Sequence, residues 1–377
     1  TLPASTTPTA RLRTRSARVS YRRAGPSTRL PPKTEHGYLN QAIGASQGDF
    51  PHVIIAPRDA EDCYNTSVEA FNLAETFQLP VILLSDLYLG EHRSTIDPDA
   101  ISPDVPIERG EWIADPGTNG EFRRYRITPS GVSPRVRPGV QGGIHVSATD
   151  DHDEQGILIS DEHTNAAIRR KMHEKRMRKM EGVLRKLPPP ALEGPPHGAA
   201  TLIGWGSTWG VIAEAAERLA KRGVPVNRLH FKYLHPFHET EARAILEGCT
   251  KTVCIEANFT GQFARHLRAE TGFTVDKVIV KYDGEPLEPG WIADRVHAWL
   301  KGEPEDLRVT EAEAREMAYH FVRVKLGDKA RPVRRAGAPH GGEPVWNVRL
   351  ADRKSGDAAG TLVIGRETGS IHAWEEA

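Results

Sequence analysis

The fold is decided by residues 53–86, which read VIIAPRDAEDCYNTSVEAFNLAETFQLPVILLSD. Two continuous apolar runs, 53–56 and 81–84, flank a stretch with apolar residues at helical spacing, and Asp59 is suited to cap a helix over residues 60–78. A strand–helix–strand unit whose strands are apolar throughout predicts a buried parallel sheet. Ser85 and Asp86 follow the second strand, at the end of the sheet where open α/β folds bind ligands.

The segment before this unit has the composition of an anion-binding loop. It reads Arg22-Arg23-Ala24-Gly25-Pro26-Ser27-Thr28-Arg29-Leu30-Pro31. The two guanidiniums precede a small Ala-Gly pair, so both charge and backbone can approach a ligand. The proline fixes one φ angle, and the two hydroxyls add hydrogen-bond donors. An exposed basic turn is the alternative that these residues leave open.

Residues 199–280 predict a second, doubly wound parallel sheet. Expected strands lie at 199–203, 224–231, 252–256 and 275–280, with helices at 211–222, before 248 and at 261–270, and 233–237 is expected to be a loop. The turn from Gly204 to Gly210 has GxGxxxG spacing rather than GxGxxG, and no acidic residue ends the second strand to hold a ribose. The pattern therefore argues against NAD and favours an anion or a partner subunit at this turn.

Composition excludes several functional classes. The chain has 377 residues with 50 Lys and Arg against 50 Asp and Glu, so no overall basic field attracts nucleic acid. No apolar run approaches the ~18 residues of a membrane span, and we expect a cytoplasmic protein. Three cysteines are too few for a [4Fe–4S] cluster, which needs about four thiolates. Any iron–sulfur chemistry must therefore belong to another chain.

Two polar stretches between these sheets are candidates for a nucleic-acid-binding helix and a metal site. Residues 163–186 form a charged helix, and we favour a linker helix that packs through Ile168, Met172, Met180 and Leu184 over a nucleic-acid-binding helix. The acidic patch 145–154 contains histidines, but its spacing matches no closed metal site, so we expect no metal there.

Taken together, the segments resemble the alpha subunit of thiamine-diphosphate-dependent 2-oxoacid:ferredoxin oxidoreductases, closest to the 2-oxoglutarate type. The resemblance covers roughly residues 23–302. It rests on the following stretches: Arg23–Pro31, Gly48–Pro51 with Ala56-Pro57, Glu69–Glu75, Pro80–Leu89, Gly204–Gly210, Glu256–Asn258 and Gly261-Gln262.

The resemblance implies an α/β fold with two parallel-sheet domains of the thiamine-enzyme type. We expect a disordered arm at 1–22, a partial pyrimidine-binding domain at 23–125 and a linker strap with the charged helix at 126–196. A transketolase C-terminal-like domain would follow at 197–302. Residues 303–377 would add a helix from a capping box at Thr310 and Glu313, and a β-hairpin of 345–350 and 361–364.

The resemblance also implies cofactors and partners. A beta subunit would hold most of the thiamine diphosphate and Mg²⁺ and would carry an iron–sulfur cluster, and the complex would use coenzyme A and ferredoxin. No catalytic residue is assigned. The substrate carboxylate is expected at Arg23, with Ser27 and Thr28, and distal or loop contacts at Arg22, Arg29 and Lys33. Interface loops are expected at Gly204, Gly206, Ser207, Thr208, Asn258 and Gln262.

The sequence departs from the family pattern in two places. Ala24 and Arg29 stand where the family has glycine, and a Thr/Arg-rich arm stands where the family has a half-domain with the glutamate that activates thiamine. We therefore expect a truncated pyrimidine domain. The alternatives are a pyruvate or branched-chain oxoacid enzyme, a non-catalytic remnant that only binds a beta subunit and, weakest, an NAD dehydrogenase.

Overall fold

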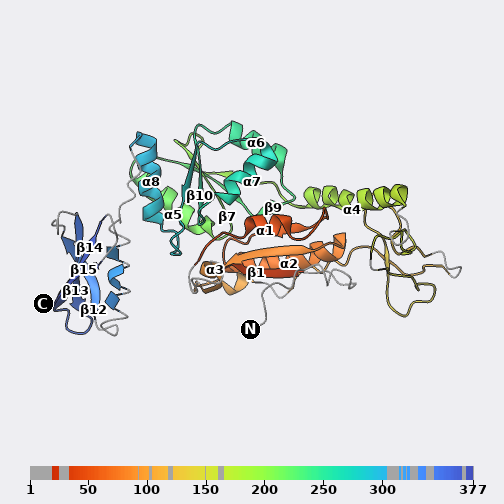
Figure 1. Cartoon of the computed structure of the whole chain (residues 1–377), viewed down its shortest axis with the longest axis horizontal. Helices are drawn as coiled ribbons and strands as arrows, with labels where there is room; N and C mark the ends of the chain where they lie inside the picture. The colour runs from red at the N-terminus through yellow and green to blue at the C-terminus, as the bar shows by residue number, and fades with distance from the viewer. Residues whose placement is uncertain are drawn as a thin grey trace. The chain divides into compact units, whose positions relative to one another are not determined.

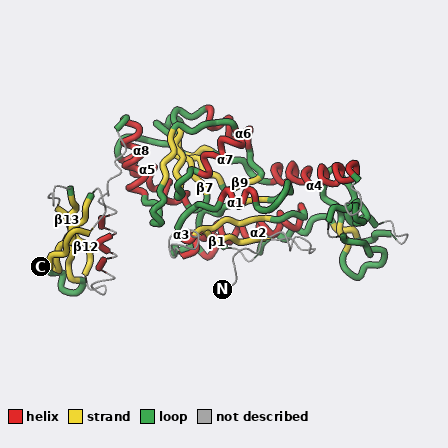
Figure 2. The backbone as a smooth tube through the Cα atoms, in the orientation of Figure 1, coloured by secondary structure: helices red, strands yellow, loops and turns green. Residues whose placement is uncertain are grey.

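The computed structural model describes residues 19–24, 34–91, 93–101, 104–117, 122–148, 150–159, 165–303, 314–315, 317–319, 321–322, 330–336, 344–366 and 371–376, with only the backbone of 19–24, 330–331, 333–336, 372 and 376. The chain divides into two compact units, Thr1–Leu287 and Glu288–Ala377. Among the described helices, none is both long and apolar enough to cross a membrane. Figure 1 traces the chain and Figure 2 its secondary structure.

The first sheet contains the predicted strand–helix–strand unit. Strand β2 (Val53–Ile55) and strand β3 (Val81–Asp86) pair in parallel, and helix α2 (Ala60–Phe77) connects them. Asp59 caps α2 by accepting a hydrogen bond from the Asp62 N–H at 2.8 Å, as the sequence predicted. The strand order is β1-β3-β2-β9. Two short helices, α1 (Leu39–Gly44) and α3 (Leu87–Glu91), lie beside this unit.

Strand β1 (Val19–Ala24) corrects the prediction of a disordered arm for residues 19–22 and of a loop beginning at Arg22, while residues 1–18 of that arm lie outside the described residues. It pairs in parallel with β3, so that Arg23 lies opposite Ser85 and Ala24 opposite Asp86. An end strand is held by main-chain hydrogen bonds to one neighbour and does not need the continuous apolar run that marks a central strand. That is why its sequence did not predict a strand.

The second sheet confirms the doubly wound pattern. Its order is β11-β10-β7-β8-β6, parallel except for the last pair. The strands are β6 (Leu192–Glu193), β7 (Thr201–Trp205), β8 (Asn227–Phe231), β10 (Thr252–Glu256) and β11 (Lys277–Val280), and the helices are α5 (Thr208–Lys221), α6 (Glu239–Glu247) and α7 (Gln262–Thr271). Helix α5 begins three residues before the predicted start, inside the expected turn.

Strand β9 (Tyr233–His235) joins the two sheets and corrects the prediction of a loop at 233–237. It leaves the second half of the chain and pairs antiparallel with β2. One core cluster contains Ile54 and Leu84 from the first sheet together with Trp205 and Phe263 from the second half. The two predicted domains, 23–125 and 197–302, therefore share a core within one unit.

Helix α4 (Ala166–Lys186) lies where a charged helix was predicted, but it buries a different face. Of the expected apolar stripe only Met172 is buried, together with Lys175, Lys179 and Val183. The Lys175 ammonium donates to the Tyr125 carbonyl and the Lys179 ammonium to the Gln78 carbonyl, each at 2.9 Å. Backbone carbonyls thus make the burial of two lysines tolerable.

The segment before α4 is mostly loop, as Figure 2 shows. It contains the short 3₁₀ helix η2 (Pro98–Ala100) and the paired strands β4 (Trp112–Ile113) and β5 (Arg135–Val136).

The second unit begins at Glu288, earlier than the predicted boundary at residue 303. It contains α8 (Pro289–Lys301) and, instead of a hairpin, an antiparallel sheet of four strands: β12 (Ala330–Ala336), β13 (Val345–Asp352), β14 (Ala358–Gly365) and β15 (Ile371–Glu376). The expected hairpin is its central pair. The described helical residues 314–315, 317–319 and 321–322 bury Ala314, Ala318 and Val322 against this sheet, while Thr310 and Glu313 lie outside the described residues.

Candidate functional site

Asp86, at the carboxyl end of β3, is the centre of a buried polar cluster. It is only 2% exposed and accepts a hydrogen bond from the Leu89 N–H at 2.7 Å. Its other oxygen lies 2.5 Å from His36 Nε2 and also accepts from the Ser207 hydroxyl. Burial by itself raises the pKa of Asp86, but hydrogen bonding and charge from His36, with the bonds from Leu89 and Ser207, outweigh it and lower that pKa. The cluster therefore holds a stable carboxylate.

The contacts of His36 show that this is not a nucleophilic triad. In such a triad the imidazole accepts the hydroxyl proton at one ring nitrogen and donates to the carboxylate from the other. Here Nε2 alone approaches both Asp86 and Ser207 Oγ, the latter at 3.1 Å, and the buried Nδ1 has no partner among the described residues. The Ser207 hydroxyl donates to Asp86. The geometry is that of a clamp between two parts of the unit, not of an activated serine.

Aromatic rings enclose the cluster. The His36 ring lies 4.7 Å from the Trp205 ring, and Tyr38 packs edge-on against Trp205 at 5.9 Å. Burial, with a smaller effect from the charge of Asp86, raises the pKa of Tyr38 well above its usual 10. Water is thereby kept from the buried side of the cluster, which strengthens its hydrogen bonds.

A strap at 34–40 carries His36 into this position. The Thr34 N–H donates to the Gly284 carbonyl at 3.0 Å and the His36 N–H donates to the Ala257 carbonyl at 2.7 Å. Gln262 fixes the other end, because its side chain donates to the Gly37 carbonyl at 3.0 Å and accepts from the Asn40 N–H at 3.1 Å. The strap is thus attached to the carboxyl ends of β10 and β11.

The predicted residues of the 204–210 turn meet at this clamp with different roles. Ser207 starts α5 without a side-chain cap, so its hydroxyl is available to Asp86. The Thr208 hydroxyl is buried and bonds the backbone of Trp205 instead. A Cβ on Gly204 would lie 2.4 Å from Ile212, and Gly206 has a φ of +55°, so both glycines are needed for the turn itself.

Asn258, another predicted interface residue, is structural. Its side chain donates to Glu256 at 2.7 Å and accepts from the Gln262 N–H at 3.2 Å. The fully buried Glu256 carboxylate also accepts from the N–H groups of Phe263 and Ala264. This carboxylate satisfies the first turn of α7, where negative charge is favoured.

The predicted substrate loop is described only at its start. Arg22 and Arg23 lie in strand β1, where the structure describes only their backbone. The other predicted contacts, Ser27, Thr28, Arg29 and Lys33, lie outside the described residues. Among the described residues, no group of three or more His, Cys, Asp or Glu side chains could hold a metal ion. The sequence reasoning missed His36. Its only signal was an imidazole in a polar segment, and its two partners lie 50 and 171 residues away.

Comparison with known proteins agrees with the resemblance. Residues 16–169 match the thiamine-diphosphate-binding domain of pyruvate flavodoxin/ferredoxin oxidoreductases. The chain is 34% identical over 285 residues to 2-oxoacid:ferredoxin oxidoreductase 2, subunit alpha, of Aeropyrum pernix, covering 74% of this chain and 43% of that protein. The chain is homologous to the alpha subunits of 2-oxoacid:ferredoxin oxidoreductases.

Two further similar proteins act on 2-oxoglutarate according to their names. The 2-oxoglutarate oxidoreductase subunit KorA of Mycobacterium tuberculosis is 34% identical over 292 residues, which is 75% of this chain and 42% of that subunit. A solved 2-oxoglutarate:ferredoxin oxidoreductase from Magnetococcus marinus, with 2-oxoglutarate, coenzyme A and succinyl-CoA bound, matches with a TM-score of 0.66 and 32% identity. It covers 75% of this chain and 48% of that one. The chain thus spans less than half the length of these relatives, and its α/β fold class is confirmed.

Proposed function

We propose that the chain is part of the alpha subunit of a 2-oxoglutarate:ferredoxin oxidoreductase. The proposed complex breaks the bond between the carboxylate and the carbonyl carbon of 2-oxoglutarate to release CO₂, transfers the acyl group to the sulfur of coenzyme A and passes two electrons to ferredoxin. The observation that carries the proposal is the match at 32% identity to an oxidoreductase whose structure contains 2-oxoglutarate, coenzyme A and succinyl-CoA.

Arg23 binds the substrate carboxylate in this proposal. A guanidinium binds a carboxylate through two hydrogen bonds and keeps its charge at any working pH. The backbone register supports this role, because Arg23 lies opposite Ser85 at the carboxyl end of β3, where α/β folds bind ligands. Ser27 and Thr28 add hydroxyls, and Arg22, Arg29 and Lys33 are candidates for the second carboxylate that distinguishes 2-oxoglutarate from pyruvate.

The cavity beside Asp86 is too small to hold a thiamine ring. The cavity beside Asp86, lined also by Thr34 and Tyr88, has a volume of about 20 Å³. That is room for about one water molecule and not for an aminopyrimidine ring. The proposal assigns most of the cofactor surface, together with Mg²⁺ and the iron–sulfur cluster, to a beta subunit.

Co-expression with a beta subunit tests the function. The purified complex should reduce ferredoxin or a viologen in a reaction that requires both 2-oxoglutarate and coenzyme A. Pyruvate and a branched-chain 2-oxoacid serve as alternative substrates, and a faster reaction with either would reassign the specificity. A stable complex that reduces no acceptor with any of them would favour a non-catalytic remnant.

Arg23→Lys provides the residue-level test. Losing one charged hydrogen bond, which contributes about 1.5–3 kcal/mol, should raise KM for the 2-oxoacid at least about tenfold. Arg218→Lys is the matched control, because Arg218 pairs with Glu214 on the exposed face of α5. An unchanged KM in Arg23→Lys would remove the proposed role.

A further inference from the structure

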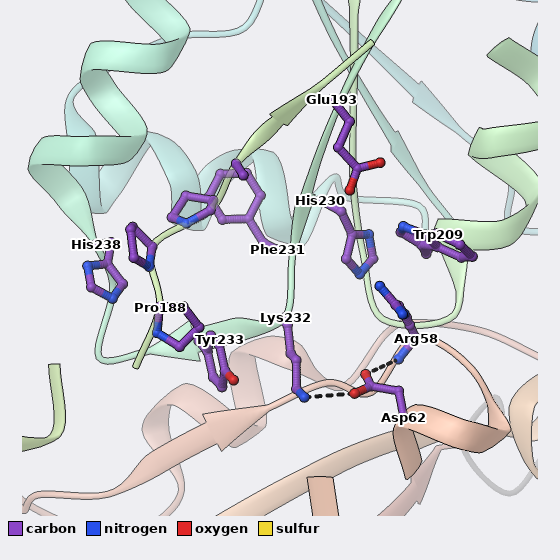
Figure 3. Close-up of a pocket in the computed structure, with 13 residues that line it drawn as sticks. Arg58, Asp62, Pro188, Glu193, Trp209, His230, Phe231, Lys232, Tyr233 and His238 are labelled. Atoms are coloured by element: carbon purple, nitrogen blue, oxygen red, sulfur yellow. Dashed lines mark hydrogen bonds and ion pairs between the residues drawn. The ribbon is translucent and has the colours of Figure 1, made fainter. Parts of the chain in front are cut away.

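A second cavity, of about 280 Å³, is lined in part by Trp209, two residues after Ser207. It is lined by the start of α2, the first turn of α5, the end of β8 and residues 188–193, which follow α4. Figure 3 shows Arg58, Trp209 and His230 at one end and Pro188, Tyr233 and His238 at the other. None of these side chains belongs to the clamp formed by His36, Asp86 and Ser207.

Arg58 is the cation that this pocket offers. Its guanidinium carbon lies 4.6 Å from the centre of the Trp209 ring. Its ion pair with Asp59, at 3.1 Å, is 44% and 39% exposed, and exposed pairs of this kind contribute little to stability. A ligand anion can therefore replace Asp59 at small cost.

The other charged groups at the pocket are already neutralised. The Lys232 ammonium lies 2.7 Å from an Asp62 oxygen and 3.3 Å from a Glu69 oxygen, and Figure 3 shows the first of these pairs. Glu193 pairs with Arg228 at 2.9 Å. An anion entering the pocket consequently meets one available guanidinium and no unpaired carboxylate from Asp62 or Glu193.

His230 adds a neutral polar group at the same end. Burial, followed by the charge of Arg58, lowers its pKa to about 3, so the imidazole stays uncharged. Its buried Nε2 has no hydrogen-bond partner among the described residues. Such an atom is better satisfied when a ligand group supplies the missing bond.

Apart from His238, the remaining walls are mostly apolar. Trp209 presents a ring face, and Pro188, Pro189 and Pro190 line the pocket with Phe231, which is 2% exposed. Tyr233 contributes its ring, since its hydroxyl is already bonded to Glu69 at 2.7 Å. Apolar walls with few polar groups are typical of small-molecule pockets, and this volume of about 280 Å³ lies just below their usual range of about 300–1,000 Å³.

We propose that this pocket binds a small organic anion, whose carboxylate or phosphate pairs with Arg58 and whose flat body extends from Trp209 towards the three prolines. Helices α2 and α5 both begin at the pocket, and helix N-termini favour negative charge. Because Trp209 follows Ser207 by two residues, the ligand contacts the same turn that bonds Asp86. The inference does not depend on the oxidoreductase function.

Calorimetric titration of the full chain tests the proposal in the absence of turnover. Benzoate and phenyl phosphate carry both a ring and an anion, acetate and inorganic phosphate lack the ring, and benzyl alcohol lacks the charge. At least one flat anion should bind about tenfold more tightly than its ringless or uncharged counterparts. The comparison of benzoate with phenyl phosphate separates a carboxylate site from a phosphate-ester site.

Two variants locate the binding. Arg58→Gln should weaken the flat anion at least about tenfold, whereas Arg218→Gln, on the exposed face of α5, should leave its affinity unchanged. Trp209→Leu keeps apolar bulk but removes the ring face, and it should also weaken binding. It therefore serves as the test if Arg58→Gln does not fold. Absence of binding by both flat anions at about 10 mM, or equal affinity in the variants and wild type, would overturn the proposal.

Discussion

Replacing Asp86 by asparagine should release the strap at 34–40. Asn keeps the shape of Asp86 and can still accept from the Leu89 N–H, but it loses the negative charge that faces His36 and Ser207. A hydrogen bond to a charged group contributes about 1.5–3 kcal/mol, and breaking a buried pair costs about 3–5 kcal/mol. Both bonds share one oxygen, and the amide can replace part of them. We therefore expect a loss of about 2–4 kcal/mol.

Hydrogen exchange is the appropriate assay, because a chain with two compact units has no single two-state unfolding free energy. The informative amides are those of Thr34, His36 and Asn40, which are bonded to Gly284, Ala257 and Gln262, respectively. A loss of about 2–4 kcal/mol lowers their protection roughly 30-fold to several hundredfold. Asp352→Asn, at an exposed turn of the second unit, is the control and should leave these amides unchanged.

The pH dependence supplies an independent check. The pKa of Asp86 lies below its ordinary 3.8 in the folded chain, so its contribution is complete above that pH and is lost as the pH falls through the lower folded value. Protection of the strap should show this acid step in the wild type and lack it in Asp86→Asn. A change in protection of less than about threefold at neutral pH would refute the clamp.

Three further outcomes follow from the structure. Gln262→Ala removes two side-chain bonds to the strap and should lower protection at Asn40 by about 1 kcal/mol in hydrogen exchange, with Gln155→Ala as a control. Gly204→Ala should destabilise the first unit by about 1–3 kcal/mol in thermal unfolding through its clash with Ile212 and Thr208, whereas Gly210→Ala, whose Cβ meets open space, should not. Burial, then Lys175, lowers the pKa of Lys179 to about 7, so the unfolded chain binds more protons between about pH 7 and 10.5 and stability should rise across that window. Lys179→Met should reduce this rise in urea titrations without abolishing it, because burial also lowers the pKa of Lys175 to about 7, and the exposed Lys171→Met should leave the rise unchanged. A pH-independent wild type would contradict the buried lysine.

The sequence predicted elements wherever local pattern and tertiary environment agree. Continuous apolar runs identified β2 and β3, and the Asp59 cap identified the start of α2, because central parallel strands and helix N-termini have strong local requirements. Strands β1 and β9 escaped prediction. Each gains its conformation from pairing with a distant strand, and neither contains the continuous apolar run that marks a central strand.

The sequence predicted helix α4 but not which of its faces is buried. The Met and Leu stripe predicted one buried face, whereas Lys175 and Lys179 are buried because the carbonyls of Tyr125 and Gln78 accept their ammonium protons. Those carbonyls come from segments 50 and 101 residues away. No local pattern indicates such a partner, so a lysine is assigned to the surface by default.

Only part of the candidate site could be predicted, because some of its contacts join residues that are far apart in the sequence. Glycine spacing identified the 204–210 turn, and strand position identified Asp86, since the ends of parallel strands meet at one edge. His36 could not be identified, because a histidine in a polar segment is compatible with any surface position. Only the antiparallel entry of β9 and the shared core bring the two halves close enough for His36 and Ser207 to meet one carboxylate.

The clamp also explains how the loop proposed to bind substrate is positioned. Ala24, the last residue of β1, lies opposite Asp86, and Thr34, the first described residue after the loop, accepts a hydrogen bond from the Tyr88 N–H at 3.3 Å. Both ends of the loop are therefore held by residues 86–88. Holding both ends lowers the entropy that residues 25–33 lose when they bind a ligand. Asp86→Asn should consequently raise KM for the 2-oxoacid more than it lowers kcat, because it loosens the loop without removing a group that contacts the reacting atoms.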